Sequence, residues 1–255
     1  METVVKRVDD FQLDGTGNAA AWNVAEWLPL LPTNQQSRTD FDELSSSLTS
    51  MSSVESSLRA EGSRVVPART GPTRPGSASG YASRAKIVYS DLGLYCLYDC
   101  ADERLTCTGL KDNDELFNED VVEAFFWPEE SQHLYLEYEI SPLGMELPLI
   151  IPNNGDFFGW IPWHYEGDRR VRRATAVRGG EKMPGAAVTG WSAEFFIPFK
   201  LMRGFRNVPP KPGTTWRANF YRIDYDRNEP ALFAWSGGVG NNFHDFRQFG
   251  TIRFA

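Results

Sequence analysis

Alternation of apolar and polar positions dominates the chain after residue 80. Short segments rich in β-branched and aromatic residues are separated there by Gly, Pro, Asn and Asp, which favour turns. These segments are 86–89, 94–100, 121–127, 134–140, 172–177, 191–197, 216–223, 232–235 and 251–254. Residues 9–31 add a further predicted strand, a turn and a short aromatic segment. No helical periodicity of similar length competes, so the sequence predicts an all-β fold, an antiparallel β-sandwich resembling a jelly roll.

The alternation also assigns side chains to faces. In 134–141 one face holds Leu134, Leu136, Tyr138 and Ile140, and the other holds Tyr135, Glu137, Glu139 and Ser141. In 216–223 one face holds Trp216, Ala218, Phe220 and Arg222, and the other holds Arg217, Asn219, Tyr221 and Ile223. Polar faces that include tyrosine suit sugar binding, because rings stack on sugar faces while carboxylates and amides bind hydroxyls. An ordinary solvated sheet face is the alternative.

Glu123 interrupts the apolar strand that follows an acidic, Asn-containing loop at 112–120. A carboxylate within a buried run must be hydrogen-bonded, paired with a cation or turned toward a cleft, since an unpaired buried charge costs several kcal/mol or takes up a proton. Two roles therefore remain open for Glu123. It either bonds an arginine or backbone amides for structural reasons, or it faces a ligand.

Composition changes abruptly between residues 45 and 80. This stretch has no aromatic residue; Ser dominates its first half, and Pro, Gly and Arg dominate its second half. Such a segment cannot bury enough apolar surface to offset the entropy lost on ordering. The sequence therefore predicts one domain over residues 1–255, interrupted by a disordered Ser/Gly/Pro-rich insertion at 45–80.

Net charge and cysteine content restrict the classes of partner and the cellular compartment that the sequence predicts. A net charge of −8 and a pI near 5.0 argue against nucleic-acid binding. No run of about 18 apolar residues is present, which predicts no membrane span, and the N-terminus shows no secretory signal. Cys96 and Cys100 lie too far apart on one predicted strand to bridge. Cys107 lies beyond a turn and could reach back to one of them, but the odd count favours buried free thiols and a reducing compartment.

Motifs along most of the chain resemble the family 9 carbohydrate-binding module. In order they are Asp14-Gly15…Trp22, Leu94-Tyr95, the 120–125 run Asp-Val-Val-Glu-Ala-Phe, the 136–142 run Leu-Glu-Tyr-Glu-Ile-Ser-Pro, 190–198, 216–222, and Trp235-Ser…Phe243-His-Asp…Phe249-Gly-Thr-Ile. The resemblance implies a β-sandwich that binds small sugars and the ends of glucan or xylan chains, usually on secreted enzymes. It also implies structural calcium ions. The resemblance implies a secreted protein, whereas the cysteine pattern favours a reducing compartment. Localisation therefore stays open.

Members that bind sugar clamp it between two tryptophans, and Phe117 and Phe243 stand at the matching positions. Phenylalanine can stack on a sugar but lacks the indole N–H. The predicted function is non-catalytic carbohydrate binding, with a small sugar or chain end held between these rings. The polar groups expected around the sugar are Glu123, Glu137, Asn219, Tyr221, Arg222, Asn241, Asn242 and His244.

Other functions remain as alternatives. A glycoside hydrolase would use two carboxylates among Glu123, Glu137 and Glu139. A haem site would need axial ligands such as Met145 and His244. A module that has lost sugar binding would keep only protein interactions. Trp160 and Trp163 are expected to be core or loop-packing residues, with replacement platforms as the alternative. Trp22, Trp27, Trp191, Trp216 and Trp235 are predicted to lie in the core.

Overall fold

The computed structural model describes residues 1–33, 81–153, 159–162, 164–227, 229–237 and 242–255. Within them the regular elements are strands and short 3-10 helices, so the predicted all-β class is confirmed. All nine predicted strands are present, with ends that differ by at most three residues. They are β3 (Ser83–Tyr89), β4 (Gly93–Cys100), β5 (Val121–Trp127), β6 (Leu134–Ile140), β8 (Arg172–Arg178), β9 (Gly190–Pro198), β10 (Thr215–Asp224), β11 (Ala231–Ala234) and β12 (Gly250–Phe254).

Three more strands were not predicted from the sequence. They are β1 (Glu2–Arg7), β2 (Leu28–Pro32) and β7 (Glu146–Pro152). β1 is highly charged, and β2 and β7 each contain two prolines, which cannot donate a ladder hydrogen bond. β7 tolerates its prolines because it lies at a sheet edge. The order predicted for residues 9–31 is wrong, since a helix, η1 (Ala20–Val24), comes first and the strand last.

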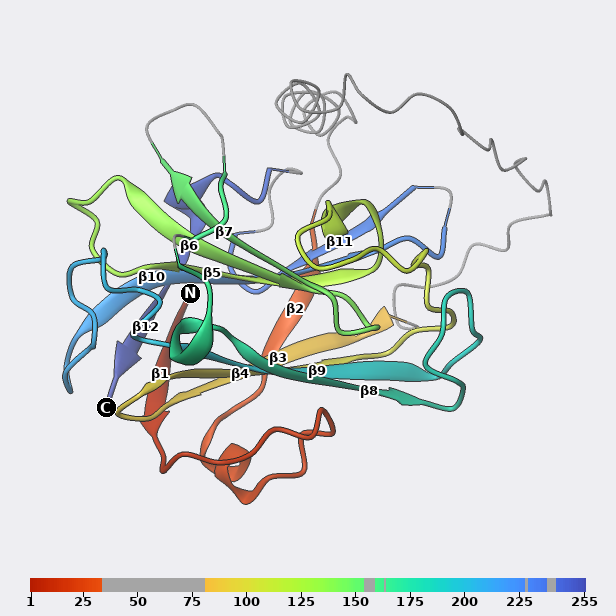
Figure 1. Ribbon diagram of the computed structural model, residues 1–255, viewed down its shortest axis with the longest axis horizontal. Helices are drawn as coiled ribbons and strands as arrows, with labels where there is room; N and C mark the ends of the chain where they lie inside the picture. Colours follow the sequence, from red (N-terminus) through yellow and green to blue (C-terminus); the bar gives the residue numbers. More distant parts are fainter. Residues whose placement is uncertain (34–80, 154–158, 163, 228, 238–241) are drawn as a thin grey trace.

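Two layers of four antiparallel strands form the body of the molecule (Figure 1). The first layer has the order β7-β6-β5-β10, and the second has the order β3-β4-β9-β8. Between the layers lies the main apolar core, to which β5 contributes Val122, Ala124 and Phe126. We call the other face of the first layer, which points away from the second layer, the outer face.

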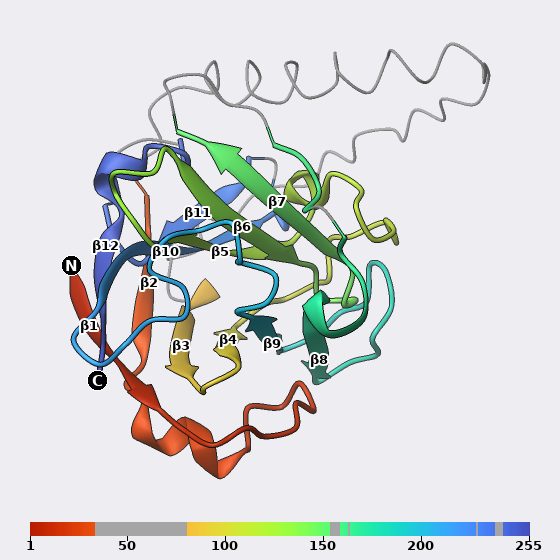
Figure 2. The same cartoon turned by 60° about the vertical axis from the view of Figure 1, so that its left-hand side comes forward.

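Four shorter strands join the two layers along one side. β10 pairs with both β11 and β12, and β3 pairs with both β2 and β1. Because β11 also pairs with β2, and β12 with β1, these six strands close into a ring. Figure 2 shows β1 beside β12 near the two chain ends. β1 runs parallel to β12 and β3, so the antiparallel prediction holds for the two layers and fails at this seam.

Several core predictions are confirmed. Trp191, Trp216 and Trp235 are buried, as is Trp22. Trp27 is an exception, because it is partly exposed and lies beneath the guanidinium of Arg84. The cysteines are buried and free, as predicted.

The predicted insertion at 45–80 lies outside the described residues, but its flanks are clear. β2 before it pairs directly with β3 after it, with Leu30 opposite Ser83. None of the helices in the described parts of the chain combines the length and the apolar character needed to cross a membrane. The remaining helices are single 3-10 turns: η3 (Leu116–Asn118), η4 (Gly167–Arg169) and η5 (Phe246–Gln248).

Candidate functional site

The outer face is not an ordinary solvated sheet face. A second apolar cluster covers it, with Phe117 and Met145 packed against its edge. Its members are Leu116, Val121, Phe125, Trp127, Tyr135, Leu147, Leu149, Ile151, Tyr221, Ile223, Leu232, Ala234, Phe243 and Phe249. Polar side chains within this face are therefore enclosed by apolar and aromatic groups.

Three glutamates on two neighbouring strands form what we call the carboxylate trio. Glu123 of β5 lies directly opposite Glu139 of β6, and Glu137 lies opposite Phe125. Glu123, Glu137 and Glu139 are 3%, 3% and 0% exposed. Apart from the contact between the Glu137 and Glu139 carboxyl groups, Glu137 Oε2 and both carboxyl oxygens of Glu139 have no hydrogen-bond partner. Buried polar atoms usually have donors, so the lack of donors from outside the trio makes these oxygens candidates for a ligand.

Burial decides the protonation of the trio. It raises the pKa of Glu137 to about 8. Burial, reinforced by the neighbouring acids, also raises the pKa of Glu123 and of Glu139 well above the usual range. Ionised carboxylates in an apolar surround repel one another and lack water, so the proton-bound forms are favoured. No Lys or Arg forms an ion pair with the trio within the described part of the chain, so the structural-partner alternative for Glu123 gains no support.

Aromatic groups from distant segments lie beside the trio. Phe243 stacks on Tyr221, with ring centroids 4.0 Å apart and planes 13° apart. His244 follows Phe243, and its Nδ1 lies 2.6 Å from the Tyr135 hydroxyl and 3.9 Å from Glu137 Oε2. Burial lowers the pKa of His244 to about 3, so the ring is neutral and can accept the Tyr135 proton. The site therefore contains a ring stack and a neutral imidazole beside three acids.

Asn219 and Tyr221 lie on the outer face as predicted, but they bond other protein groups. Asn219 Nδ2 donates to the Tyr221 hydroxyl at 2.7 Å and to the Ser236 carbonyl at 2.8 Å. The Tyr221 hydroxyl in turn donates to the Phe243 carbonyl at 2.9 Å. This chain of bonds fixes Phe243 and its loop against β10, so both residues shape the site.

The prediction that Arg222 contacts the ligand is wrong. Its guanidinium points into the core between the layers, where it donates to Asp102 at 3.0 Å and to Asp224 at 2.5 Å. It also donates to Ser83 Oγ and the Ala101 carbonyl. Side chains alternate along a strand, so the residue after Tyr221 must face the opposite way.

The remaining predicted residues are placed as follows. Phe117 is partly buried at the edge of the outer-face cluster, and Phe243 is a buried member of it. Asn242 is exposed, and its Oδ1 accepts the His244 amide at 2.9 Å. Asn241 and Trp163 lie outside the described residues. Trp160 is 42% exposed, so it is not a core residue.

Tyr135 was missing from the predicted site, and Glu139 entered it only for the hydrolase alternative. Both lie on the same face of β6 as Glu137, and the period of two indicated this. The signal was thus present in the sequence. What the sequence lacked was the position of His244, which meets Tyr135 only through the fold.

A second acidic group lies away from the trio. One carboxylate oxygen from each of Asp102, Asp120 and Asp226 lies within 4.8 Å of the others. Burial raises the pKa of Asp102 to about 7 and that of Asp120 to about 8. Asp226 Oδ2 is buried without a hydrogen-bond partner. Asp102 also pairs with Arg222, and Asp120 accepts the Thr106 and Tyr225 amides. The free Asp226 oxygen beside two further carboxylates is a candidate ligand for a hard cation that takes oxygen ligands, such as calcium.

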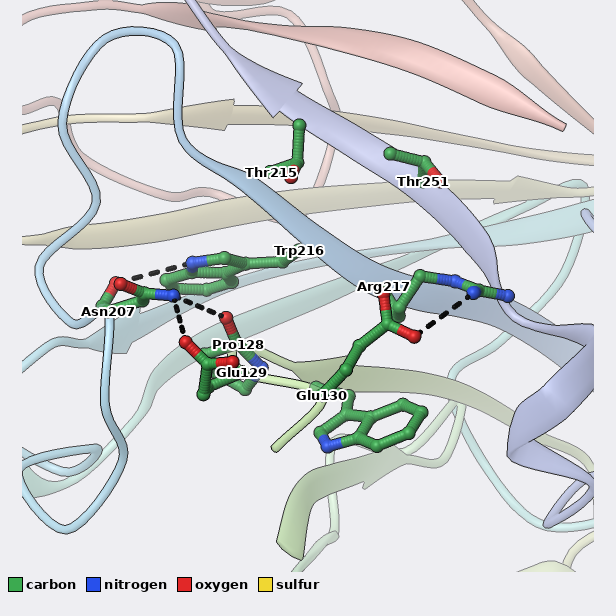
Figure 3. A pocket seen from close by; sticks show the side chains of 9 residues that line it. Pro128, Glu129, Glu130, Asn207, Thr215, Trp216, Arg217 and Thr251 are labelled. Atoms are coloured by element: carbon green, nitrogen blue, oxygen red, sulfur yellow. Dashed lines mark hydrogen bonds and ion pairs between the residues drawn. The ribbon is translucent and has the colours of Figure 1, made fainter. Parts of the chain in front are cut away.

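A cavity of about 250 Å³ lies at the start of β10, where Thr215, Trp216 and Arg217 line it (Figure 3). Trp127 also lines this cavity. Its amide, carboxylate and guanidinium side chains have partners among the lining residues. Asn207 Nδ2 donates to Glu129 Oε2 at 2.7 Å, and Arg217 lies 3.5 Å from Glu130. Because these groups satisfy one another, the cavity is a weaker candidate than the carboxylate trio.

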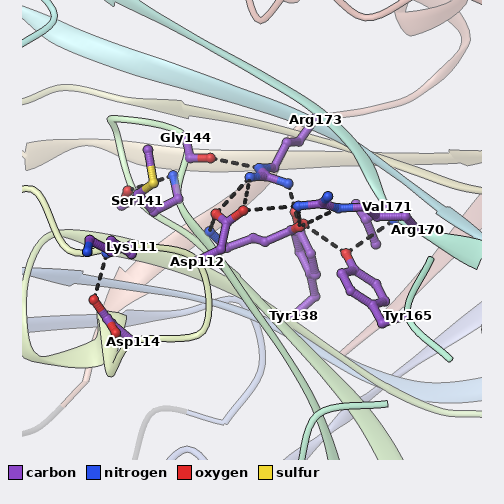
Figure 4. Close-up of polar contacts among 12 residues, drawn as sticks. Lys111, Asp112, Asp114, Tyr138, Ser141, Gly144, Tyr165, Arg170, Val171 and Arg173 are labelled. Carbon is purple, nitrogen blue, oxygen red and sulfur yellow. Dashed lines mark hydrogen bonds and ion pairs between the residues drawn. The ribbon is translucent and has the colours of Figure 1, made fainter. Parts of the chain in front are cut away.

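The acidic loop before β5 begins with a structural group, shown in Figure 4. Asp112 accepts bonds from Arg173 at 2.7 Å and from Arg170 at 3.0 Å. The same two arginines bind Glu146 at the start of β7, which also accepts bonds from the Tyr138 and Tyr165 hydroxyls at 2.8 Å. Since Arg173 belongs to β8, these contacts connect the two layers at their open edge.

Comparison with solved structures finds related folds. A candidate carbohydrate-binding protein from Bacteroides uniformis ATCC 8492 has a TM-score of 0.68 at 17% identity, and the match covers 100% of this chain and 99% of that one. A family 9 carbohydrate-binding module from Caldicellulosiruptor kristjanssonii has a TM-score of 0.58 at 14% identity in complexes with cellotriose and with glucose. Those matches cover 100% of this chain and 93% and 96% of the others. Comparison with curated protein sequences finds no match.

The sequence model of the family described as Carbohydrate-binding family 9 matches residues 77–254. This span includes β3 to β12 and therefore both layers and the outer face. The family consists of non-catalytic binding modules, so the hydrolase alternative for the carboxylate trio is set aside. The extent of the match shows that the chain belongs to carbohydrate-binding family 9.

Proposed function

We propose that the outer face binds a small sugar or the end of a polysaccharide chain at the carboxylate trio. The observation that carries this proposal is the set of unpartnered, buried oxygens on Glu137 and Glu139 beside the Phe243–Tyr221 ring stack. Sugars offer hydroxyl donors to such oxygens and apolar ring faces to aromatic side chains. Glu123, Glu137, Glu139 and His244 supply the polar contacts, and Phe117 and Phe243 supply the apolar ones.

We further propose that the ligand belongs to the glucan or xylan class. Support comes from the Caldicellulosiruptor kristjanssonii module, whose structures contain cellotriose and glucose. A clamp made of Phe117 and Phe243 would suit one or two sugar units better than a long chain lying in a groove. The phenylalanines offer smaller faces than tryptophans, so we expect weak affinity.

Calorimetric titration with glucose, cellotriose and xylotriose tests this function. Phe243→Ala and Phe117→Ala should each weaken binding by about 1–3 kcal/mol, as expected when an aromatic anchor is lost. If both rings grip one ligand, the double variant should lose less than the sum of the single losses. Glu130→Gln, at the cavity in Figure 3, is the control and should bind as the parent does. Absence of binding to every sugar would favour a module that has lost this function.

We also propose that Asp102, Asp120 and Asp226 hold a structural calcium ion. The buried, unpartnered Asp226 Oδ2 supports this assignment. Calcium at about 100 times its Kd should add about 2.7 kcal/mol to the free energy of unfolding, which corresponds to roughly 5–10 °C in Tm. Asp226→Asn should abolish the calcium-dependent shift. If a chelator leaves the Tm of the parent unchanged, the assignment fails.

The domain boundary is also a proposal. We propose one binding domain over residues 1–255, with 45–80 inserted into it. The pairings of β1 with β12 and of β2 with β3 support this, because they tie the segment before the insertion to the layers after it.

A further inference from the structure

The charge around the carboxylate trio is unusual for a site that takes neutral sugars. Other titratable groups act on it from the surrounding elements: Glu115, Tyr135, Tyr221, Tyr225 and His244. None of these five is positively charged near neutral pH, since burial lowers the pKa of His244 to about 3. Within the described residues, the trio therefore has several acids and no cation.

A metal ion is not the natural counterion here. Among the described residues, oxygens from three acidic side chains lie within 4.8 Å of one another in the aspartate group but not in the trio. Calcium binds oxygens at about 2.3–2.6 Å, whereas an N–H donor lies at about 2.7–3.2 Å from its acceptor. An ammonium group can therefore span more widely spaced carboxylates. It also offers three donors and a full positive charge.

We propose that this site prefers a sugar with a protonated amine, such as a glucosamine unit at a chain end, over neutral or acidic sugars of the same size. The inference rests on the proposed function of the outer face and names its ligand class. The ammonium donates to Glu137 Oε2 and to the Glu139 oxygens, which lack partners outside the trio. It also supplies the charge that lets these carboxyl groups ionise in an apolar surround.

Proton release accompanies such binding. Burial raises the pKa of Glu137 to about 8, so this group holds a proton in the free protein at neutral pH. An ammonium beside it stabilises the ionised form, and the proton passes to the buffer. The measured heat of binding should consequently depend on the ionisation enthalpy of the buffer.

Calorimetry near pH 7 with glucosamine, glucose, N-acetylglucosamine and glucuronate tests the inference. Glucosamine should bind about tenfold or more tightly than glucose, the scale of one charge-assisted hydrogen bond. N-acetylglucosamine, which has no charge on its nitrogen, should show no such gain, and glucuronate should bind most weakly. Glucose binding as tightly as glucosamine would overturn the inference and leave the proposed function intact. Failure of all four sugars would overturn both.

Glu137→Gln removes the charge while keeping the shape of the side chain. It should cut the advantage of glucosamine over glucose by about fivefold or more and reduce the buffer dependence of the heat. The matched Glu130→Gln control should retain both effects. If Glu137→Gln keeps the full glucosamine preference, the carboxylate trio is not its source and the inference fails.

Discussion

Glu194 and Glu139 are both completely buried on strands of opposite layers, yet their surroundings differ. Glu194 of β9 accepts hydrogen bonds from the Gly15 amide and the Trp22 indole, each at 2.6 Å, and from the Asp14 amide at 3.0 Å. Glu139 of β6 accepts none from described residues outside the trio. The N-terminal segment thus supplies hydrogen-bond donors to Glu194 in the second layer. No described segment outside the trio does the same for Glu139 in the first layer. The difference separates an acid that holds the fold together from acids left for a ligand.

Glu146 follows the pattern of Glu194. Two arginines and two tyrosine hydroxyls surround its carboxylate (Figure 4). Burial of a carboxylate is therefore not by itself a sign of function in this protein. The informative feature is burial without donors.

The largest expected effect tests this difference with one chemical change at two positions. Glu194→Gln should lower the free energy of unfolding by about 3–4 kcal/mol, because it weakens three buried hydrogen bonds to a charged acceptor. Glu139→Gln replaces a carboxyl group that has no donor from outside the trio and should leave stability unchanged or raise it slightly. Urea unfolding of both variants measures the contrast. Equal losses at the two positions would show that Glu139 also has a structural role.

The two arginines that bind Asp112 and Glu146 offer a second contrast, with a smaller expected effect on stability. Arg173 is 19% exposed and Arg170 is 50% exposed, although both bind Asp112 and Glu146. Arg173→Ala should cost about 2–3 kcal/mol, because it leaves a fully buried carboxylate poorly compensated. Arg170→Ala should cost less than about 1 kcal/mol, since water screens an exposed ion pair. Thermal unfolding of the two variants measures these losses. A larger drop in Tm for Arg170→Ala than for Arg173→Ala would contradict this assignment.

The pH dependence of stability tests the trio itself. The pKa of Glu137 is about 8 in the folded protein, above its value of about 4.3 in an unfolded chain. The folded state therefore holds a proton that the unfolded chain releases, and this contribution to stability falls as pH rises between these values. Glu137→Gln should make the decline of Tm from about pH 6.5 to 8 shallower, by an amount worth about 1–2 kcal/mol.

The range from pH 6.5 to 8 lies above the region in which His244 titrates. In that lower region the titration of His244 changes stability in the opposite direction. Burial lowers the pKa of His244 to about 3, so its contribution is lost as pH falls below about 6.5. Glu130→Gln serves as the control and should keep the slope of the parent. A slope in Glu137→Gln equal to that of the parent would argue that Glu137 is ionised in the folded state.

Period-two alternation was sufficient to predict nine strands and the faces of β6 and β10. It failed for β2 and β7, where prolines break the pattern and only pairing with neighbours stabilises an extended chain. It grouped Arg222 with Trp216, Ala218 and Phe220, which the structure places in the core, so the alternation argued against Arg222 as a ligand contact.

The site was predictable only in part, for a physical reason. Glu123, Glu137 and Glu139 share a face that the sequence reveals, but the presence of donors depends on which distant segment covers that face. For Glu194 the covering segment lies about 180 residues away, as the Gly15 contact shows. Alternation along one strand carries no information about such a partner. The absence of donors around the trio therefore had to come from the structure.

The smallest expected effect concerns the segment predicted to be dispensable. Deletion of 45–80 would leave 11 of the 47 residues that join Thr33 to Tyr81, and β2 and β3 flank this connection as direct partners. Each doubling of loop length costs about 0.6 kcal/mol in closure entropy, so the shorter loop should stabilise the protein by about 1 kcal/mol. Tm should rise by a few degrees at most, and the sugar affinity should stay at the parent value. Thermal unfolding and calorimetry of the deletion variant measure both quantities, with a Gly/Ser replacement of equal length as the control. A marked drop in Tm for the deletion and for the replacement alike would show that side chains of this segment pack on the domain, and that its composition was misinterpreted.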